Sequence, residues 1–203
     1  MLRAMRLVLA TTNRGKAAEF KRIFEGHEVL AASELKLDFH YREDGSTFLE
    51  NAMGKAKTLF NVAGEPVLAD DSGLSVPALG GEPGVLTARY GSVGEETGMS
   101  DADRYRYLLA RMKGIQDRRA FFTCCMVLLI GEERFFVVQE TLWGLIAEKP
   151  AGTGGFGYDP VFYVPEYAKT IAELPDNVKD AISHRGKTGR RMLTLLATLS
   201  EAE

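Results

Sequence analysis

The sequence is poor in cysteine and in long hydrophobic runs. Its 203 residues include 2 cysteines, Cys124 and Cys125, and neighbouring side chains of a strand face opposite ways, so a disulfide between them is not expected. Both are therefore interpreted as ordinary residues of a reduced, intracellular protein. The apolar run at residues 7–10 is too short for a signal peptide, and no run approaches the roughly 20 residues of a membrane span. We expect a cytoplasmic protein without a membrane partner.

Positive charge and histidine are scarce as well. Lys and Arg number 25 against 28 Asp and Glu, for a net charge of −3, so the chain lacks a broad basic field and no stable nucleic-acid complex is expected. The histidines, His27, His40 and His184, lack metal-ligand spacing, which argues against a zinc site. Ser72 has no G-x-S-x-G context, which argues against a serine hydrolase.

The chain does have enough apolar residues, 45%, for a sizeable core in one domain over residues 1–203, with or without two lobes. Apolar runs predict strands at residues 7–10, 29–31, 67–71 and 161–164. Helical spacing predicts helices after residue 16, from about Thr47, after Ser100 and after Gly186. Residues 121–130 and 134–142 predict a hairpin. Strands and helices alternate in the first part of the chain and a β-hairpin follows, which predicts a mixed α/β sheet.

Two adjacent carboxylates, Asp70 and Asp71, follow the apolar run at residues 67–69, and Gly73 breaks the pattern. In an open α/β sheet, ligands bind outside the carboxyl ends of the strands, so we expect this pair at the mouth of a cleft. Only one of the two need face the ligand, because neighbouring side chains alternate. Such carboxylates suit Mg²⁺, which takes oxygen ligands and substrate phosphates. The alternative interpretation is a capped turn.

The polar segment between the first strand and the first helix is Thr11-Thr12-Asn13-Arg14-Gly15-Lys16. Backbone N–H groups at a helix start favour anions, and Lys16 adds a charge that can reach a phosphate. The segment is not a Walker A loop, because Ala10 and Ala17 stand where that pattern needs Gly and Ser or Thr. The alternative is a solvated helix cap with a surface lysine.

A glycine-rich loop at residues 152–157 matches G-x-G-x-x-G, but a β-like run follows it where a dinucleotide fingerprint needs a helix. We therefore expect the glycines to let the backbone approach a ligand, with Phe156 offering its ring to a base. The alternative is a loop whose Phe packs inward.

Three basic residues lie near the end of the chain, Lys179, His184 and Arg185. Lys179 could meet a phosphate, and His184 with Arg185 could donate to a base carbonyl. The alternative is a solvated helix end, since cations favour helix C-termini. Glu43 is a single acid in a polar loop, either a solvated charge or a second ligand for a cation held by Asp71.

Several motifs occur in order along the chain. They are Thr11-Thr12-Asn13-Arg14-Gly15-Lys16, Glu43-Asp44-Gly45, Thr47-Phe48-Leu49-Glu50-Asn51-Ala52, Leu68-Ala69-Asp70-Asp71-Ser72-Gly73-Leu74, Ala88-Arg89-Tyr90, Gly154-Gly155-Phe156-Gly157-Tyr158-Asp159-Pro160 and Ile182-Ser183-His184-Arg185-Gly186. Together they resemble the inosine triphosphate pyrophosphatase family, and the resemblance covers essentially the whole chain. Thr12, where small residues are more usual, and residues 187–189 depart from the family pattern.

The resemblance implies a long central mixed β-sheet with flanking helices and two lobes, with the active-site cleft between them. It also implies a homodimer, Mg²⁺ dependence and hydrolysis of noncanonical purine nucleoside triphosphates (ITP, dITP and XTP) to monophosphate and pyrophosphate.

The resemblance also implies roles for individual residues. Glu43 and Asp71 would bind the metal, and Asp71 would accept a proton. The triphosphate would be held by residues 11–16, Ser72 and Lys179. The base would be held by Phe156, Gly157, Tyr158, Asp159, His184 and Arg185. Lys55 is a further candidate for a phosphate contact.

Two alternatives stay open. The chain could be a pyrophosphatase of the same fold acting on other nucleotides, or a nucleotide-binding protein without catalysis.

Overall fold

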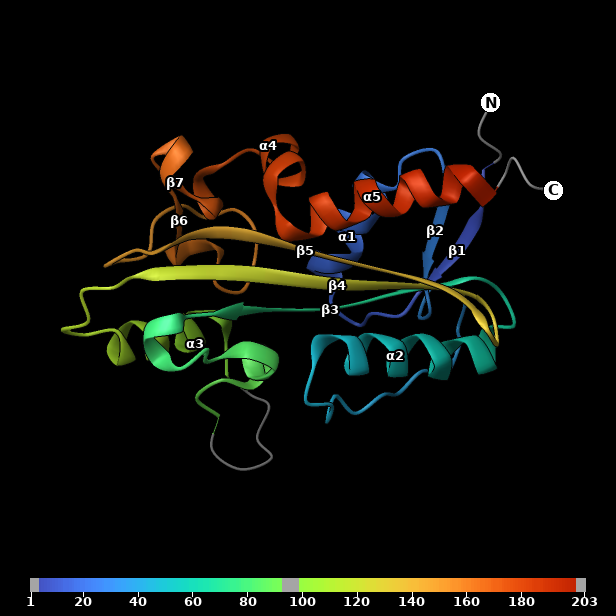
Figure 1. The fold of residues 1–203 in the computed structure, drawn as a ribbon, viewed down its shortest axis with the longest axis horizontal. Helices are drawn as coiled ribbons and strands as arrows, with labels where there is room; N and C mark the ends of the chain where they lie inside the picture. The colour runs from blue at the N-terminus through green and yellow to red at the C-terminus, as the bar shows by residue number, and fades with distance from the viewer. Residues whose placement is uncertain (1–3, 93–98, 200–203) are drawn as a thin grey trace. The chain divides into compact units, whose positions relative to one another are not determined.

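The computed structural model describes residues 4–92 and 99–199 and contains a mixed sheet of seven strands (Figure 1). The strands are β1 (Arg6–Leu9), β2 (Glu28–Ala31), β3 (Val67–Ser75), β4 (Arg119–Gly131), β5 (Arg134–Ile146), β6 (Phe162–Val164) and β7 (Lys169–Thr170). Their order is β2-β1-β3-β4-β5-β6-β7. β1 pairs in parallel with β2 and β3, whereas β6 pairs antiparallel with β5 and β7. The predicted mixed α/β sheet is confirmed.

Polar side chains cap the starts of several helices. The helices are α1 (Arg14–Ile23), α2 (Phe48–Ala63), α3 (Asp101–Arg111), α4 (Asp176–Ile182) and α5 (His184–Leu199). Asn13 accepts from the N–H of Lys16, Thr47 forms a capping box with Glu50, and Ser100 accepts from the N–H of Asp103. In the part of the chain that the structure describes, no helix combines the length and the apolar composition that crossing a bilayer needs.

The chain divides into two compact units. The first unit comprises Met1–Asp71, Cys124–Glu140 and Ser183–Glu203, and the second comprises Ser72–Thr123 and Thr141–Ile182. The cleft expected from the resemblance stays a prediction.

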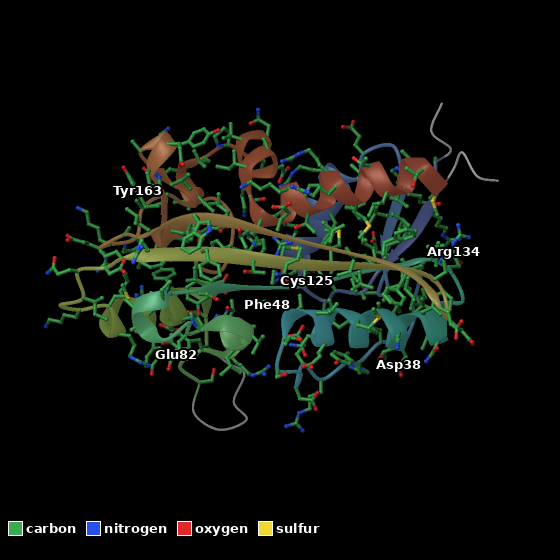
Figure 2. All side chains as sticks on the ribbon, viewed as in Figure 1. Asp38, Phe48, Glu82, Cys125, Arg134 and Tyr163 are labelled. Atoms are coloured by element: carbon green, nitrogen blue, oxygen red, sulfur yellow. The ribbon has the colours of Figure 1, made fainter. Side chains whose placement is uncertain are left out.

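The first unit has an apolar core on each face of its part of the sheet. Phe20 of α1, Phe24 directly after that helix and Met192 of α5 pack with alternate residues of β1, β3 and β4, Cys124 among them. On the other face, α2 packs with the intervening residues, and Cys125 lies in this second core (Figure 2). Figure 1 shows α1 and α5 on one side of these strands and α2 on the other. The two cysteines therefore face opposite ways and are unpaired by a disulfide, as expected.

The second unit has its own core. Leu74 of β3 and Val76 directly after that strand pack there with Leu108 of α3, and the rings of Phe122 and Phe162 lie 4.6 Å apart. The glycine-rich loop leads into a short 3₁₀ turn, Asp159–Val161, and then into β6. The absence of a helix at this point agrees with the rejection of a dinucleotide fingerprint.

Several expected boundaries were wrong, and α1, expected after residue 16, begins at Arg14. β3 does not end at Asp71 but continues to Ser75. The pairing of β3 with β1 ends at Leu68, after which β3 continues beside β4. Asp70 and Asp71 therefore lie inside β3, just beyond the point where β1 ends. The last helix begins at His184, not after Gly186, because the Ser183 hydroxyl accepts from the N–H of Gly186 at 3.0 Å and so caps α5.

Candidate active site

Asp70 is a buried carboxylate that two positively charged side chains contact. Its Oδ2 lies 2.9 Å from Nζ of Lys16, in the first turn of α1, and 3.5 Å from Nη2 of Arg185, in the first turn of α5. Only 1% of Asp70 is exposed. Burial would raise the pKa of Asp70, but the charges of Lys16, Arg185 and Lys55 outweigh it and hold that pKa well below its usual range. Asp70 therefore stays ionised and fixes Lys16 at the helix start.

Arg185 also forms a buried ion pair with Glu19 of α1 through Nη1 and Oε2. Arg185 and Glu19 are 2% and 3% exposed, and the neighbouring His184 is also buried. Burial would lower the pKa of Arg185, but Glu19 and Asp70 raise it, so the guanidinium stays charged. The interpretation of these cations as a solvated helix end is wrong, because they lie at the buried start of α5.

Asp71 faces the other side of β3, where α2 provides its partners. Asn51 Nδ2 donates to Asp71 Oδ2 at 3.1 Å, and Lys55 Nζ donates to Asp71 Oδ1 at 3.2 Å. The same ammonium donates to Glu43 Oε1 at 2.6 Å, so Glu43 is not simply a solvated charge. Asp70 and Asp71 thus point to opposite faces of the strand, as the alternation of a strand requires.

The environment of Asp71 favours a protonated carboxyl more than that of Asp70 does. Burial raises the pKa of Asp71, and Glu43 adds to this, while Lys55 and Lys16 oppose it. For Lys55, burial would lower the pKa, but Asp71, Asp70 and Glu43 raise it. The result is a carboxylate of increased basicity beside a charged lysine.

The pair that could hold a cation is Glu43 and Asp71, because one positive group, the ammonium of Lys55, already contacts both. Within residues 4–92 and 99–199, no group of three or more His, Cys, Asp or Glu side chains is arranged to hold a metal ion. A metal at this place would therefore have two protein carboxylates and would fill its remaining positions from water or substrate. That ligand set suits Mg²⁺, which usually binds through one or two carboxylates together with substrate phosphates.

The second unit contains a separate cluster around Asp159. Lys179 Nζ of α4 donates to Asp159 Oδ2 at 2.6 Å and lies 4.8 Å from the centre of the Phe156 ring. The N–H of Phe156 donates to the same Oδ2 at 2.8 Å. Asp159 and Lys179 are both buried. The carboxylate therefore fixes the lysine against the aromatic ring.

Gly155 is required for this arrangement. Its φ is +70°, and a Cβ there would lie 2.0 Å from Asp159 Oδ2 and 3.0 Å from Lys179 Nζ. Any side chain at this position would therefore displace the ion pair as well as strain the backbone.

The structure brings the predicted residues together in two sets. In the first unit, Lys16 and Arg185 meet at Asp70, and Glu43 and Asp71 meet at Lys55. Of the remaining members of the first segment, Thr11 Oγ1 accepts from the N–H of Asn13, while Thr12, Arg14 and Gly15 lie at the start of α1. In the second unit, Phe156, Asp159 and Lys179 are in contact, and Ser72 lies in β3. The Tyr158 hydroxyl donates to the carbonyl of Thr87 at 3.0 Å.

The sequence reasoning missed Glu19, Asn51 and the central position of Asp70. A signal existed for Glu19, which lies three residues after Lys16 and therefore on the same face of α1. Asp70 gave no local signal, because its partners are 54 and 115 positions away in the sequence.

Comparisons with known proteins agree with this architecture. A sequence model of the Ham1 family matches residues 7–195. The chain is 47% identical over 183 residues to a dITP/XTP pyrophosphatase of Treponema denticola, covering 90% of this chain and 94% of that protein. It is 48% identical over 199 residues to a dITP/XTP pyrophosphatase of Thermus thermophilus, covering 95% and 92%.

Solved structures give the same result. A HAM1 protein from Coxiella burnetii matches with a TM-score of 0.83 and 38% identity, over 96% of this chain and 98% of that one. The Ham1 protein of Staphylococcus aureus matches with a TM-score of 0.81 and 41% identity, over 98% and 100%. By sequence and by fold, the chain belongs to the Ham1 family.

Proposed function

We propose that this chain is a nucleoside-triphosphate pyrophosphatase that hydrolyses dITP, XTP and ITP to the monophosphate and pyrophosphate. The observation that carries the proposal is the pairing of Asp71 and Glu43 through Lys55 in the first unit. It provides a basic carboxylate, a second acid and a cation, in a chain similar over nearly its whole length to dITP/XTP pyrophosphatases. The activity would clear deaminated purines from the nucleotide pool.

The metal of the proposal is Mg²⁺, held by Glu43 and Asp71. When bound, it neutralises phosphate charge and lowers the pKa of a coordinated water. Two carboxylates that already share one cation support a site that substrate oxygens complete. Lys55 would then release one carboxylate and turn toward the phosphates.

Asp71 is the proton acceptor in this proposal. A water attacks the α-phosphorus, its proton passes to a carboxylate oxygen of Asp71, and the bond from the α-phosphorus to the bridging oxygen breaks, so that pyrophosphate leaves. The position of Asp71 supports the assignment, because its carboxylate is buried beside Glu43 and Lys55, where a water next to the metal and the phosphates would lie within reach. Asn51 orients Asp71 by donating to its other oxygen.

The remaining predicted roles form the rest of the proposal. Lys16, with residues 11–15, Ser72 and Lys179 contact the triphosphate and stabilise charge on the leaving pyrophosphate. The loop from Phe156 to Asp159 contacts the base, with the ring of Phe156 stacked on it. His184 and Arg185 set the preference for a carbonyl at the purine six-position, since an amino group cannot accept from them.

We also propose that the chain acts as a homodimer, as the family resemblance implies, and that it does so in the cytoplasm. Light scattering coupled to size exclusion measures the mass: a single peak at twice the 22.3 kDa of the chain is expected, and a monomer would refute the dimer.

The activity is tested with the purified chain and a panel of triphosphates, dITP, XTP, ITP, GTP, ATP and TTP, with pyrophosphate release measured in Mg²⁺ and in chelator. Turnover of dITP, XTP and ITP well above that of ATP, and none in chelator, is expected. Equal rates on ITP and ATP would favour the alternative of a broader nucleotide pyrophosphatase. Absence of pyrophosphate with every substrate would favour a binding protein without catalysis.

A further inference from the structure

Two consecutive backbone N–H groups in the glycine-rich loop each donate to a carboxylate. The N–H of Phe156 donates to Asp159 Oδ2 at 2.8 Å, and the N–H of Gly157 donates to Asp101 Oδ2 at 2.7 Å. Asp159 belongs to the same turn, whereas Asp101 lies 56 positions earlier, in the first turn of α3. Hydrogen bonds to a charged acceptor are stronger than those between neutral groups. The two peptide groups on either side of Phe156 are therefore each held by a carboxylate, one from the loop's own turn and one from α3.

Asp101 is itself held in place by Arg104. Nη2 of Arg104 pairs with Asp101 Oδ1, and Nη1 of Arg104 donates to the carbonyl of Met99 at 2.7 Å. One carboxylate oxygen of Asp101 thus contacts Arg104, and the other accepts from the loop. Although 43% of the Asp101 side chain is exposed, contacts at both oxygens fix its position.

The ring of Phe156 depends on both contacts. Lys179, held by Asp159, lies against the ring, while Asp101 holds the next amide, at Gly157, whose φ is +63°. We infer that Asp101 is a positioning residue that tethers the glycine-rich loop to α3 and so holds Phe156 ready for the base of the substrate. This inference rests on the proposed function for its effect on turnover, but the tether itself does not depend on any substrate.

The chain offers a matched control. Asp103 lies in the same first turn of α3, carries the same charge and contacts Ser100 and Arg106 on the exposed side of the helix. Asp101→Ala removes the tether, Asp101→Asn keeps an acceptor oxygen in nearly the same place, and Asp101→Glu keeps the charge but moves the acceptor by one methylene. Asp103→Ala removes a charge from the same turn without touching the loop.

Two measurements on the full chain decide the matter. The first is backbone hydrogen exchange of peptides covering residues 152–158, without ligand. Asp101→Ala and Asp101→Glu are expected to speed this exchange by about tenfold or more, since a charged hydrogen bond is lost, while Asp101→Asn and Asp103→Ala leave it near wild type. The second is steady-state kinetics with dITP, where the Ala and Glu variants should raise KM by about tenfold and change kcat by less than about twofold.

Unchanged exchange in both Asp101→Ala and Asp101→Glu would overturn the tether. A fall in kcat without a rise in KM, or equal effects from Asp103→Ala, would overturn the positioning role. A wild-type chain that leaves dITP and XTP intact would refute the proposed function instead, and the exchange comparison would still decide whether Asp101 holds the loop.

Discussion

The buried pair between Glu19 and Arg185 predicts a large and specific loss of stability in Glu19→Gln. Glutamine keeps the shape of the side chain and one acceptor oxygen but removes the negative charge. Arg185, 2% exposed, would keep its contact with Asp70, whose Oδ2 lies 3.5 Å from its Nη2.

The size of the effect follows from the burial. Breaking a buried ion pair by removing one partner costs about 3–5 kcal/mol. Because Asp70 still balances part of the charge, we expect the lower end, about 3 kcal/mol. A domain has only about 5–15 kcal/mol of net stability, so this is a substantial fraction. For a chain of this length it corresponds to a fall of about 6–12 °C in the unfolding midpoint.

Urea unfolding followed by far-ultraviolet circular dichroism measures the loss. The control is Lys21→Gln, on the same helix α1, which removes the pair between Lys21 and Glu34 at 2.7 Å. Those two side chains are 44% and 43% exposed, so this change should cost less than about 1 kcal/mol. If Glu19→Gln cost no more than Lys21→Gln, the reasoning from burial would be refuted.

Three further predictions concern the carboxylates and the ring. Asp71→Asn should lower turnover of dITP by orders of magnitude while circular dichroism shows an intact fold, because the amide cannot accept the proton; near-normal turnover would remove Asp71 from the reaction. Phe156→Ala should raise KM for dITP by about tenfold, since stacking on a base contributes about 1–3 kcal/mol, and an unchanged KM would exclude stacking. Asp70→Asn should reduce the loss of unfolding free energy that occurs as the pH falls. The pKa of Asp70 is lowered in the folded state, so its contribution is complete above the unfolded value of about 4 and is lost as the pH falls toward the folded value. Urea unfolding from about pH 2 to pH 6 measures this slope, and equal slopes in the variant and the wild type would contradict the assignment.

Local chemistry made much of the fold predictable. Apolar runs gave the positions of the strands, and side chains such as Asn13 and Ser100 marked the helix starts, because capping depends on residues three positions apart. The continuation of β3 to Ser75 was not predictable in this way. Asp70 to Ser75 form a strand because β4 lies beside them, and that neighbour is distant in the sequence.

The same distinction holds for the candidate site. Residue types and motif order indicated Lys16, Glu43 and Asp71, but the sequence did not reveal that Asp70 would collect the charges of Lys16 and Arg185. Those contacts depend on how α1 and α5 pack on one face of the sheet. Burial of a polar group is decided by packing and not by its neighbours in the chain, which is why Arg185 was expected in solvent as one alternative and lies in the interior.

The adjacent cysteines offer a way to watch the two cores separately. Cys124 belongs to the core beneath α1 and α5, and Cys125 to the core beneath α2. Burial raises the pKa of the thiols to about 12 and about 11, so at neutral pH neither is a ready nucleophile while the native packing holds. Alkylation of Cys124 or of Cys125 therefore records the opening of the core to which that sulfur belongs. Because the two cysteines are adjacent, one proteolytic fragment contains both, and its alkylation pattern shows which of the two cores opens first.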